Sequence, residues 1–169
     1  MRAPFPFTLR TSLRPGDLGT IVHLHGDLYS REYGFDASFE AYVAGPLSEL
    51  ALRGSSRERL WIAERDGKFL GCVAIVDASD DIAQLRFYLV VPEARGSGIG
   101  RRLLEEAVAF ARDEGYVSIF LWTVGALEAA AHLYRAAGFV KVEEVPGAPW
   151  GVPVVEEKYV LHFAGEEIV

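Results

Sequence analysis

The sequence predicts one domain of the mixed α/β (α+β) class, in which helices pack on a mixed sheet. Length, composition and the period of the apolar residues carry this prediction. At 169 residues, with 50% hydrophobic and 24% charged side chains, the chain can bury one sizeable core. The apolar period alternates between that of helices and that of strands, which predicts both elements interleaved along the chain. We therefore expect residues 1–169 to form a single domain.

The first part of the chain predicts a short strand and two helices. Residues 8–11 form the candidate strand, and Pro15-Gly16-Asp17 is typical of a helix start, with proline early and an acid in the first turn. Apolar residues then follow helical spacing until Tyr33-Gly34. A second helical stretch begins near Asp36, and we expect Pro46 to kink or restart it.

The middle of the chain predicts an antiparallel meander, because the apolar pattern shortens to the period of strands. Turn signals at Asp66-Gly67 and Asp80-Asp81 separate three runs. The expected strands cover residues 60–63, 69–76 and 82–91.

The remainder of the chain predicts two helices and three strands. The helices are expected over residues 99–111 and 127–137, each stopped by a following glycine. The strands are expected over 117–122, 139–145 and 156–163. The first of these is continuously apolar, as expected for a strand buried on both faces.

Charge and cysteine content exclude several classes of function. Because 17 basic and 24 acidic side chains give a net charge of −7, we expect neither nucleic acid nor a membrane as a partner. Cys72 is the single cysteine, which excludes an intrachain disulfide and a Cys-based zinc site, and we expect it in the core. No apolar run approaches the ~20 residues of a membrane helix. We expect a cytoplasmic protein without a metal ion.

The segment from Val90 to Arg102 carries the strongest functional signal. Glycines at 96, 98 and 100 stand between the end of a strand and the start of a helix, where unpaired N–H groups and the helix dipole favour an anion. Arg95, Arg101 and Arg102 add positive charge, so we expect a phosphate cradle here. The candidate binding residues are Val90, Val91, Arg95, Gly96, Ser97, Gly98, Ile99, Gly100 and Arg101. A glycine-rich turn with surface arginines is the structural alternative.

The spacing of the glycines narrows the choice of phosphate ligand. A dinucleotide fingerprint would need glycine where Arg101 stands, and the Gly-Lys-Ser/Thr of a Walker A loop is absent. Arg-Gly-x-Gly-x-Gly instead resembles the acetyl-CoA-dependent acyltransferases of the GNAT superfamily. Leu133 to Phe139 resembles a second segment of that family, and Leu13 to Asp17 its opening. The resemblance covers nearly the whole chain.

A narrower resemblance lies in residues 23–36. They are similar to the acetyltransferase half of bacterial proteins that fuse a MarR-type DNA-binding domain to a GNAT domain. We expect the acetyltransferase domain here without the DNA-binding one.

The GNAT resemblance implies a mostly antiparallel sheet splayed between the strand ending at Val91 and the strand 117–122. It implies that acetyl-CoA is the co-substrate, with its pantetheine in that cleft beside Val90 and Val91, and its pyrophosphate on Arg95 to Arg101. It also implies that Tyr134 protonates the departing CoA thiolate, and that a homodimer is possible.

Three positions differ from many relatives in that family. Val124 and Leu127 stand where an asparagine often begins the last helix. Gln84 stands where a glutamate often acts as general base, so the base is elsewhere or is water.

The acceptor side has four weaker candidates. His25, Tyr29 and Glu32 share one helix face at i, i+4 and i+7, and could line an acceptor pocket; the alternative is ordinary packing with a solvated Glu32. Trp150 lies in a Pro/Gly loop and is either a substrate wall or a loop anchor.

The sequence therefore predicts an N-acetyltransferase that passes acetyl from acetyl-CoA directly to the amine of a small molecule or peptide. One alternative is a non-catalytic acyl-CoA-binding module, and another is a nucleotide-binding regulatory domain. The sequence does not identify the acceptor.

Overall fold

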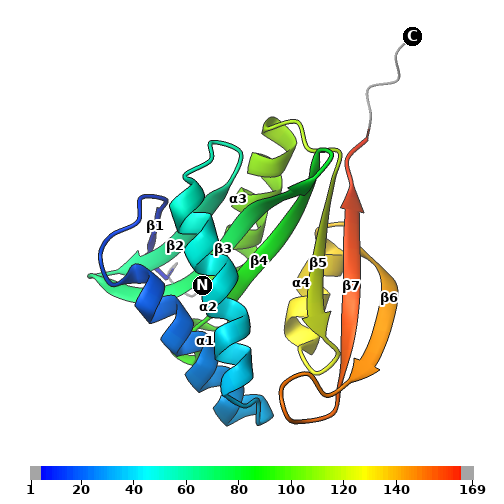
Figure 1. Ribbon diagram of the computed structural model, residues 1–169. Helices are drawn as coiled ribbons and strands as arrows, with labels where there is room; N and C mark the ends of the chain where they lie inside the picture. The colour runs from blue at the N-terminus through cyan, green and yellow to red at the C-terminus, as the bar shows by residue number, and fades with distance from the viewer. Residues whose placement is uncertain (1–4, 165–169) are drawn as a thin grey trace.

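The computed structural model describes residues 5–164 and confirms the mixed α/β class. Figure 1 shows the strands β1 (Thr8–Arg10), β2 (Arg59–Arg65), β3 (Lys68–Ser79), β4 (Ile82–Val90), β5 (Ser118–Val124), β6 (Val140–Gly147) and β7 (Val154–His162). The helices are α1 (Asp17–Tyr33), α2 (Ala37–Arg53), α3 (Ile99–Asp113) and α4 (Glu128–Ala136), with a 3-10 turn η1 (Pro92–Ala94). The elements follow the order that the sequence predicts.

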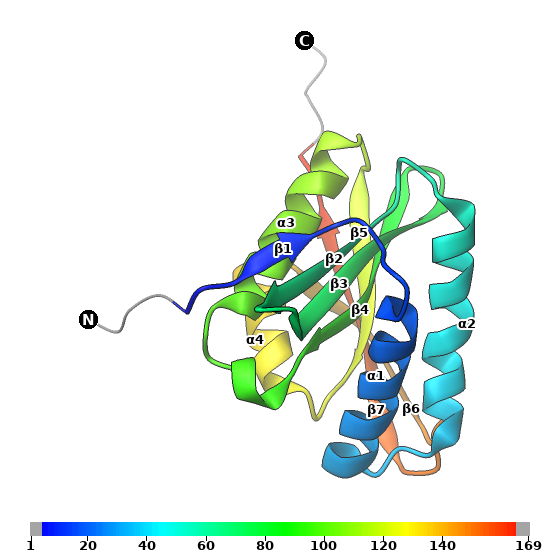
Figure 2. The same ribbon diagram turned by 90° about the vertical axis from the view of Figure 1, so that its left-hand side faces the viewer.

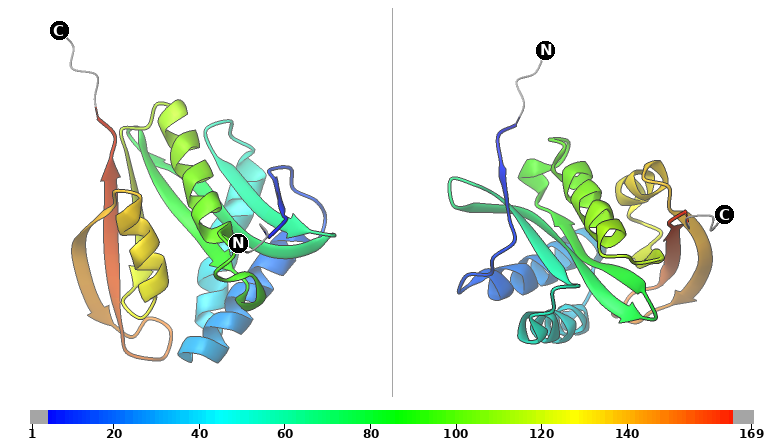
Figure 3. Two further views of the ribbon diagram at one scale, coloured as in Figure 1. Left: turned by 180° about the vertical axis from the view of Figure 1, so that it is seen from behind. Right: turned by 90° about the horizontal axis from the view of Figure 1, so that it is seen from above.

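The helices cover both faces of one sheet with strand order β1-β2-β3-β4-β5-β7-β6. Helices α1 and α2 lie on one face and α3 and α4 on the other (Figures 2 and 3). Each face buries its own apolar core. Ile21 and Phe39 belong to the core under α1 and α2, whereas Leu103 and Tyr134 belong to the core under α3 and α4.

The sheet splays at its centre, as expected. Strands β4 and β5 are parallel and pair only from Ile82 with Ser118 to Gln84 with Phe120, after which the two strands separate (Figure 1). All other neighbouring strands are antiparallel. Residues 85–90 of β4, and the loop that follows them, therefore lie beside the separation rather than within a continuous sheet.

A bulge in β4 changes which face its side chains meet. Ala74 pairs with Arg86 and Cys72 with Leu89, so β4 has one extra residue opposite β3, and Phe87 adopts φ 56°. Leu85 belongs to the core under α3 and α4, whereas Phe87 belongs to the core under α1 and α2. The strand thus presents Arg86 and Phe87 to one side of the sheet and Tyr88 to the other.

Three details differ from the sequence-based expectation. Helix α2 runs unbroken through Pro46, so the expected restart is wrong; its buried residues on both sides of the proline hold the two halves as one helix. Strand β5 begins after Val117, which is 56% exposed, and Trp122 is half-buried, so the expected burial of that segment on both faces is wrong at these positions. Cys72 lies in the core, as expected.

Within residues 5–164, none of the helices combines the length and the apolar character needed to cross a bilayer.

Candidate active site

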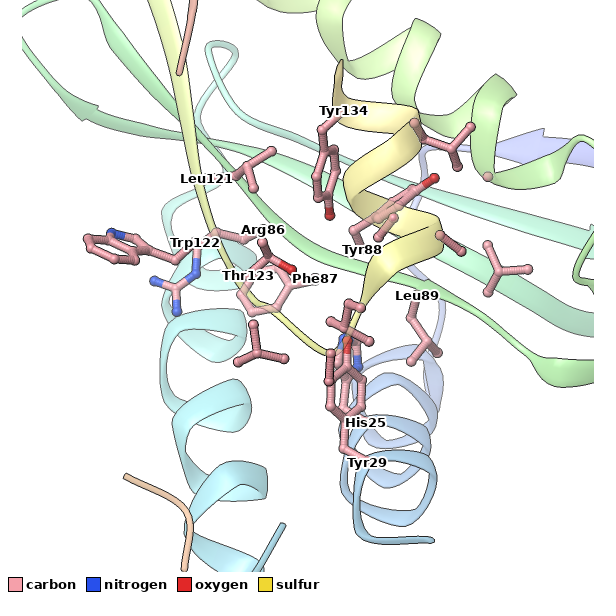
Figure 4. A pocket seen from close by; sticks show the side chains of 18 of the residues that line it. His25, Tyr29, Arg86, Phe87, Tyr88, Leu89, Leu121, Trp122, Thr123 and Tyr134 are labelled. Atoms are coloured by element: carbon pink, nitrogen blue, oxygen red, sulfur yellow. The ribbon is translucent and has the colours of Figure 1, made fainter. Parts of the chain in front are cut away.

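A cavity of about 890 Å³ occupies the cleft between β4 and β5. Residues of α1 and α2 line it from one face of the sheet, and residues of α4 and the loop before α3 line it from the other. Figure 4 shows Tyr134 and Tyr88 on the side of α4, and His25 and Tyr29 on the side of α1. One cavity therefore joins the glycine-rich loop to the aromatic residues expected on the acceptor side.

The glycine-rich loop presents unoccupied backbone donors to this cavity. Gly98 is the N-cap of α3 at φ 91°, with no side chain bonded to the first turn, and the hydroxyl of Ser97 donates instead to the carbonyl of Ala94. A Cβ at Gly98 would meet no atom within 4 Å, so the space in front of the helix is open. Open space, free N–H groups and the helix dipole together suit an anion.

Gly100 has a different role, since it lets α3 approach β4. A Cβ at this position would lie 2.7 Å from the hydroxyl oxygen of Tyr88. Any larger residue would move the start of α3 away from the strand. Gly98 thus leaves open space for an anion, and Gly100 allows the start of α3 to pack closely against β4.

The predicted phosphate-binding residues divide into two groups. The cavity is lined by Val90, Arg95, Gly96, Gly98, Gly100 and Arg101. Ile99 buries its side chain completely, so it can contribute its backbone but no side-chain contact. Arg102 pairs with Glu106 at 2.7 Å and lines a separate surface depression beside β1, so the expected contribution of its charge to the cradle is wrong.

The expected backbone role of Val91 is also wrong. Its N–H donates to the carbonyl of Leu70 at 3.0 Å and is therefore occupied. Because backbone groups alternate along an extended strand, Val90 turns its N–H and carbonyl toward the opposite edge, where β5 no longer pairs. The N–H of Val90 is the backbone donor available to a ligand in the cleft, since its carbonyl already accepts from Arg95 Nε at 3.3 Å.

Arg95 and Glu32 meet each other rather than acting in the separate sites that the sequence predicted. The two guanidinium–carboxylate contacts are 2.6 and 3.0 Å, and Arg95 Nε also donates to the carbonyl of Val90 at 3.3 Å. The Glu32 carboxylate raises the pKa of Arg95. Glu32 is therefore neither a free anion facing an amine nor a solvated side chain; the pair joins the end of α1 to the glycine-rich loop.

Tyr134 lies where it can reach a group in the cleft. It is 4% exposed, lines the cavity and points its hydroxyl into it (Figure 4). Burial raises its pKa well above the ordinary value, so the phenol stays protonated at neutral pH. The ring of Tyr88 is 5.7 Å away, and within residues 5–164 the buried Tyr88 hydroxyl has no hydrogen-bond partner. Two protonated phenols therefore border the cavity.

His25 is a neutral acceptor in this cavity. Its Nδ1 lies 2.8 Å from the carbonyl oxygen of Ile21, which can only accept, so Nδ1 carries the proton and Nε2 keeps a lone pair. Burial lowers the pKa of His25 to about 4. Tyr29 stacks beside it at 6.0 Å, and burial raises the pKa of Tyr29. Both residues line the cavity, as expected for the acceptor side.

Trp150 lines the cavity and also anchors its loop, so the two expected roles do not exclude each other. Its carbonyl accepts the N–H of Asp36 at 3.0 Å. Its ring lies 5.0 Å from Phe35 and Phe39 and 5.3 Å from Tyr42. The loop after β6 is thus fixed against α2 by an aromatic cluster that forms one wall of the cavity.

The polar and charged residues that line the cavity but were not predicted from the sequence include Arg86, Thr123, Glu128 and Glu156. Arg86 faces the acceptor side by ordinary alternation with Leu85, whereas the bulge that brings Phe87 to the same face has no signal in the residues of β4, which contain no glycine. Glu156 comes from β7, whose position next to β5 follows from the strand order rather than from local pattern. Gln84, Val124 and Leu127 line the cavity too.

Metal-ligating side chains are not clustered in the part of the chain described here: residues 5–164 contain no group of three or more His, Cys, Asp or Glu residues placed to hold a metal ion.

The split sheet, the capless helix start and the cavity between them are the features that the resemblance to the GNAT superfamily implies. The family model described as the acetyltransferase (GNAT) family matches residues 23–139. Because that match covers more than half of the chain, the protein belongs to the GNAT family.

Relatives in sequence agree with this assignment. An uncharacterized N-acetyltransferase of Schizosaccharomyces pombe is 30% identical over 146 residues, which is 85% of this chain and 88% of the relative. The IAA acetyltransferase of Azospirillum brasilense is 32% identical over 127 residues, 75% of this chain and 74% of the relative. N-acetyltransferase family 8 member 3 of Rattus norvegicus is 35% identical over 89 residues, 50% of this chain. The chain spans only 39% of that rat protein.

Solved structures share the fold. That of yncA from Salmonella typhimurium, determined with its cofactor acetyl-CoA, superposes with a TM-score of 0.77 at 18% identity, over 96% of both chains. The ribosomal-protein-alanine N-acetyltransferase of Brucella melitensis gives 0.75 at 20% identity, over 92% of this chain and 99% of that one.

Proposed function

We propose that this protein is an N-acetyltransferase that passes acetyl from acetyl-CoA directly to the amine of a small molecule or peptide. The observation that carries the proposal is one continuous cavity with the open, capless start of α3 in its lining and the Tyr134 hydroxyl in the same lining. In acetyl-CoA bound in that cleft, the phosphates would lie at the start of α3 and the sulfur would lie near the Tyr134 hydroxyl, at different ends of the same cavity.

CoA would bind along the cleft. Its pyrophosphate would accept from the first N–H groups of α3, with Arg101 adding charge. Its pantetheine would pair with the backbone of Val90, whose edge β5 leaves free. The structure of yncA with acetyl-CoA supports this reading, because the two folds correspond over nearly their whole length.

The chemistry would depend mainly on alignment. An amine with a pKa near 10 must lose a proton before it attacks the thioester carbonyl. The N–H of Val90 would stabilise the oxyanion of the tetrahedral intermediate. As the carbon–sulfur bond breaks, the sulfur keeps the bonding electrons, and the Tyr134 hydroxyl donates a hydrogen bond to the developing thiolate, which takes its proton from water.

The base that takes the amine proton is not Gln84, because an amide has no basic site of suitable pKa. His25 has a pKa of about 4 and is therefore a weak base in this site. Glu156 presents a half-buried carboxylate to the cavity and forms no ion pair with the described residues. We assign proton acceptance to water, with Glu156 as the carboxylate that would relay the proton outward.

A non-catalytic acyl-CoA-binding module is the second candidate. It is favoured by the start of α4, where Leu127 is the N-cap and supplies no side-chain hydrogen bond, and where Val124 is 6% exposed. Neither Val124 nor Leu127 has a polar side chain that could bond a pantetheine amide.

Two measurements on one preparation separate the candidates: CoA affinity by calorimetry, and release of CoA from acetyl-CoA with a panel of amines. Tight CoA binding with amine-dependent turnover supports the enzyme, whereas tight binding without turnover on any amine supports the binding module. Weak CoA binding beside tight ATP or NAD binding would favour a nucleotide-binding domain. Homodimer formation, a cytoplasmic location, a bacterial source and the kinship to MarR–GNAT fusions stay sequence-based predictions.

A further inference from the structure

Arg86 is a guanidinium in the acceptor half of the cavity, and no carboxylate among residues 5–164 forms an ion pair with it. We infer that it binds a carboxylate of the acceptor, and that the acceptor is an amino acid with an aromatic side chain. This inference rests on the proposed acetyltransferase function and names the substrate class of the same site.

The place of Arg86 in β4 separates it from the CoA-binding loop. It follows Gln84, the last residue of β4 that pairs with β5, so it lies at the closed end of the cleft, whereas the loop after Val90 lies at the open end. Arg86 alternates with Leu85, which faces α3 and α4, so Arg86 faces α1 and α2, and Figure 4 shows its guanidinium on the same side of the cavity as Trp122. Arg86 is therefore positioned for the acceptor rather than for a phosphate of CoA.

The immediate surroundings of Arg86 are aromatic. Its guanidinium carbon lies 5.4 Å from the ring centre of Tyr42 and 5.3 Å from that of Phe87. A guanidinium that stacks on rings keeps the N–H groups at its edge free for a planar carboxylate. Within residues 5–164, Arg86 forms no ion pair, in contrast to Arg95, which Glu32 neutralises.

The acceptor half of the cavity also has side chains that could contact the ring and the amino group of an aromatic amino acid. Phe39, Tyr42 and Trp150 form an aromatic wall, with Phe39 and Trp150 buried and their ring centres 5.0 Å apart. Such a wall favours an aromatic or apolar side chain. Glu156 supplies one negative charge across the cleft, on β7, which attracts the ammonium form of the amine on arrival. One cation, one anion and an aromatic wall match the charges and shape of such a zwitterion.

The test compares each amino acid with the amine that lacks its carboxylate. Phenylalanine and phenethylamine, tyrosine and tyramine, and tryptophan and tryptamine are titrated calorimetrically into protein saturated with CoA. The proteins are wild type, Arg86→Gln, Arg86→Lys and the control Arg112→Gln, which removes the same charge from an exposed site on α3 outside the cavity. Acetylation of the same compounds is followed by CoA release.

We expect wild type to bind at least one amino acid about 10- to 100-fold more tightly than its decarboxylated partner. Arg86→Gln should remove that difference and change the amine affinity by less than about twofold, while Arg86→Lys retains part of it. If no amino acid is preferred over its amine, or if Arg86→Gln weakens both ligands equally, the inference is wrong. Carboxylate-dependent binding without acetylation would overturn the proposed function instead, and leave the assignment of Arg86 standing.

Discussion

Replacing Gly98 by aspartate should abolish CoA binding through charge rather than through unfolding. The new carboxylate would enter the open space before α3, where a Cβ meets no atom within 4 Å. At roughly 5 Å from a phosphate charge and an effective dielectric constant near 20, the repulsion is about 3 kcal/mol, which is about a 150-fold loss of affinity. Because Gly98 has φ 91°, any side chain there also carries strain of about 1–2 kcal/mol.

The matched control is Gly98→Asn, which shares the size, the strain and the tolerance of left-handed backbone, but has no charge. Calorimetric titration with CoA and thermal unfolding are measured on both variants. We expect equal melting temperatures for the two variants and a loss of CoA affinity that is much larger for aspartate. Equal CoA affinity in folded Gly98→Asp and wild-type protein would refute the assignment of this loop.

Three further changes probe the charges around the site. Arg101→Gln should weaken CoA binding by about tenfold, and acetyl-pantetheine binding much less, whereas Arg102→Gln should leave both unchanged; calorimetry with the two ligands checks this. Glu32→Gln should tighten CoA binding by a few-fold because it releases the Arg95 guanidinium beside the loop, and weaker binding would contradict that reading. His25 has a pKa of about 4 in the fold against 6.5 unfolded, so its stabilising contribution is complete above pH 6.5 and is lost as the pH falls toward 4. The free energy of unfolding should drop by about 3 kcal/mol over that range, and denaturant melts of His25→Phe should lack this component.

Most of the fold could be predicted from sequence, because its determinants are local. Turn residues such as Asp66-Gly67 and the change of apolar period mark the strand and helix boundaries to within a few residues. Pro46 shows the limit of local rules: a buried stripe of four side chains along α2 holds the helix together across a residue that removes one of its hydrogen bonds.

The part of the candidate site formed by the glycine-rich loop could be predicted from the sequence. The part formed by contacts between residues far apart in the sequence could not. The glycines and Arg101 reach the cavity because a strand, a loop and a helix follow each other directly. The ion pair of Arg95 with Glu32 joins the glycine-rich loop to α1. Because the two residues lie far apart in the sequence, no local pattern predicts this contact. The Phe87 ring lies beside Arg86 because of a bulge in which Phe87 adopts a positive φ, a conformation that its residue type does not predict.

Tyr134→Phe tests the central claim of acetyl transfer in this cleft most directly. The variant keeps the buried ring, which packs against Tyr88, Phe139 and Tyr159, and removes the hydroxyl that points into the cavity. Turnover with acetyl-CoA and an amine, and CoA affinity, are measured on the same folded protein. We predict that kcat falls by about 10²–10⁴-fold while CoA affinity stays nearly constant, because the hydroxyl acts on the leaving thiolate and not on binding. Normal turnover in a folded Tyr134→Phe variant would contradict the account, because transfer would then not use the hydroxyl that points into this cleft.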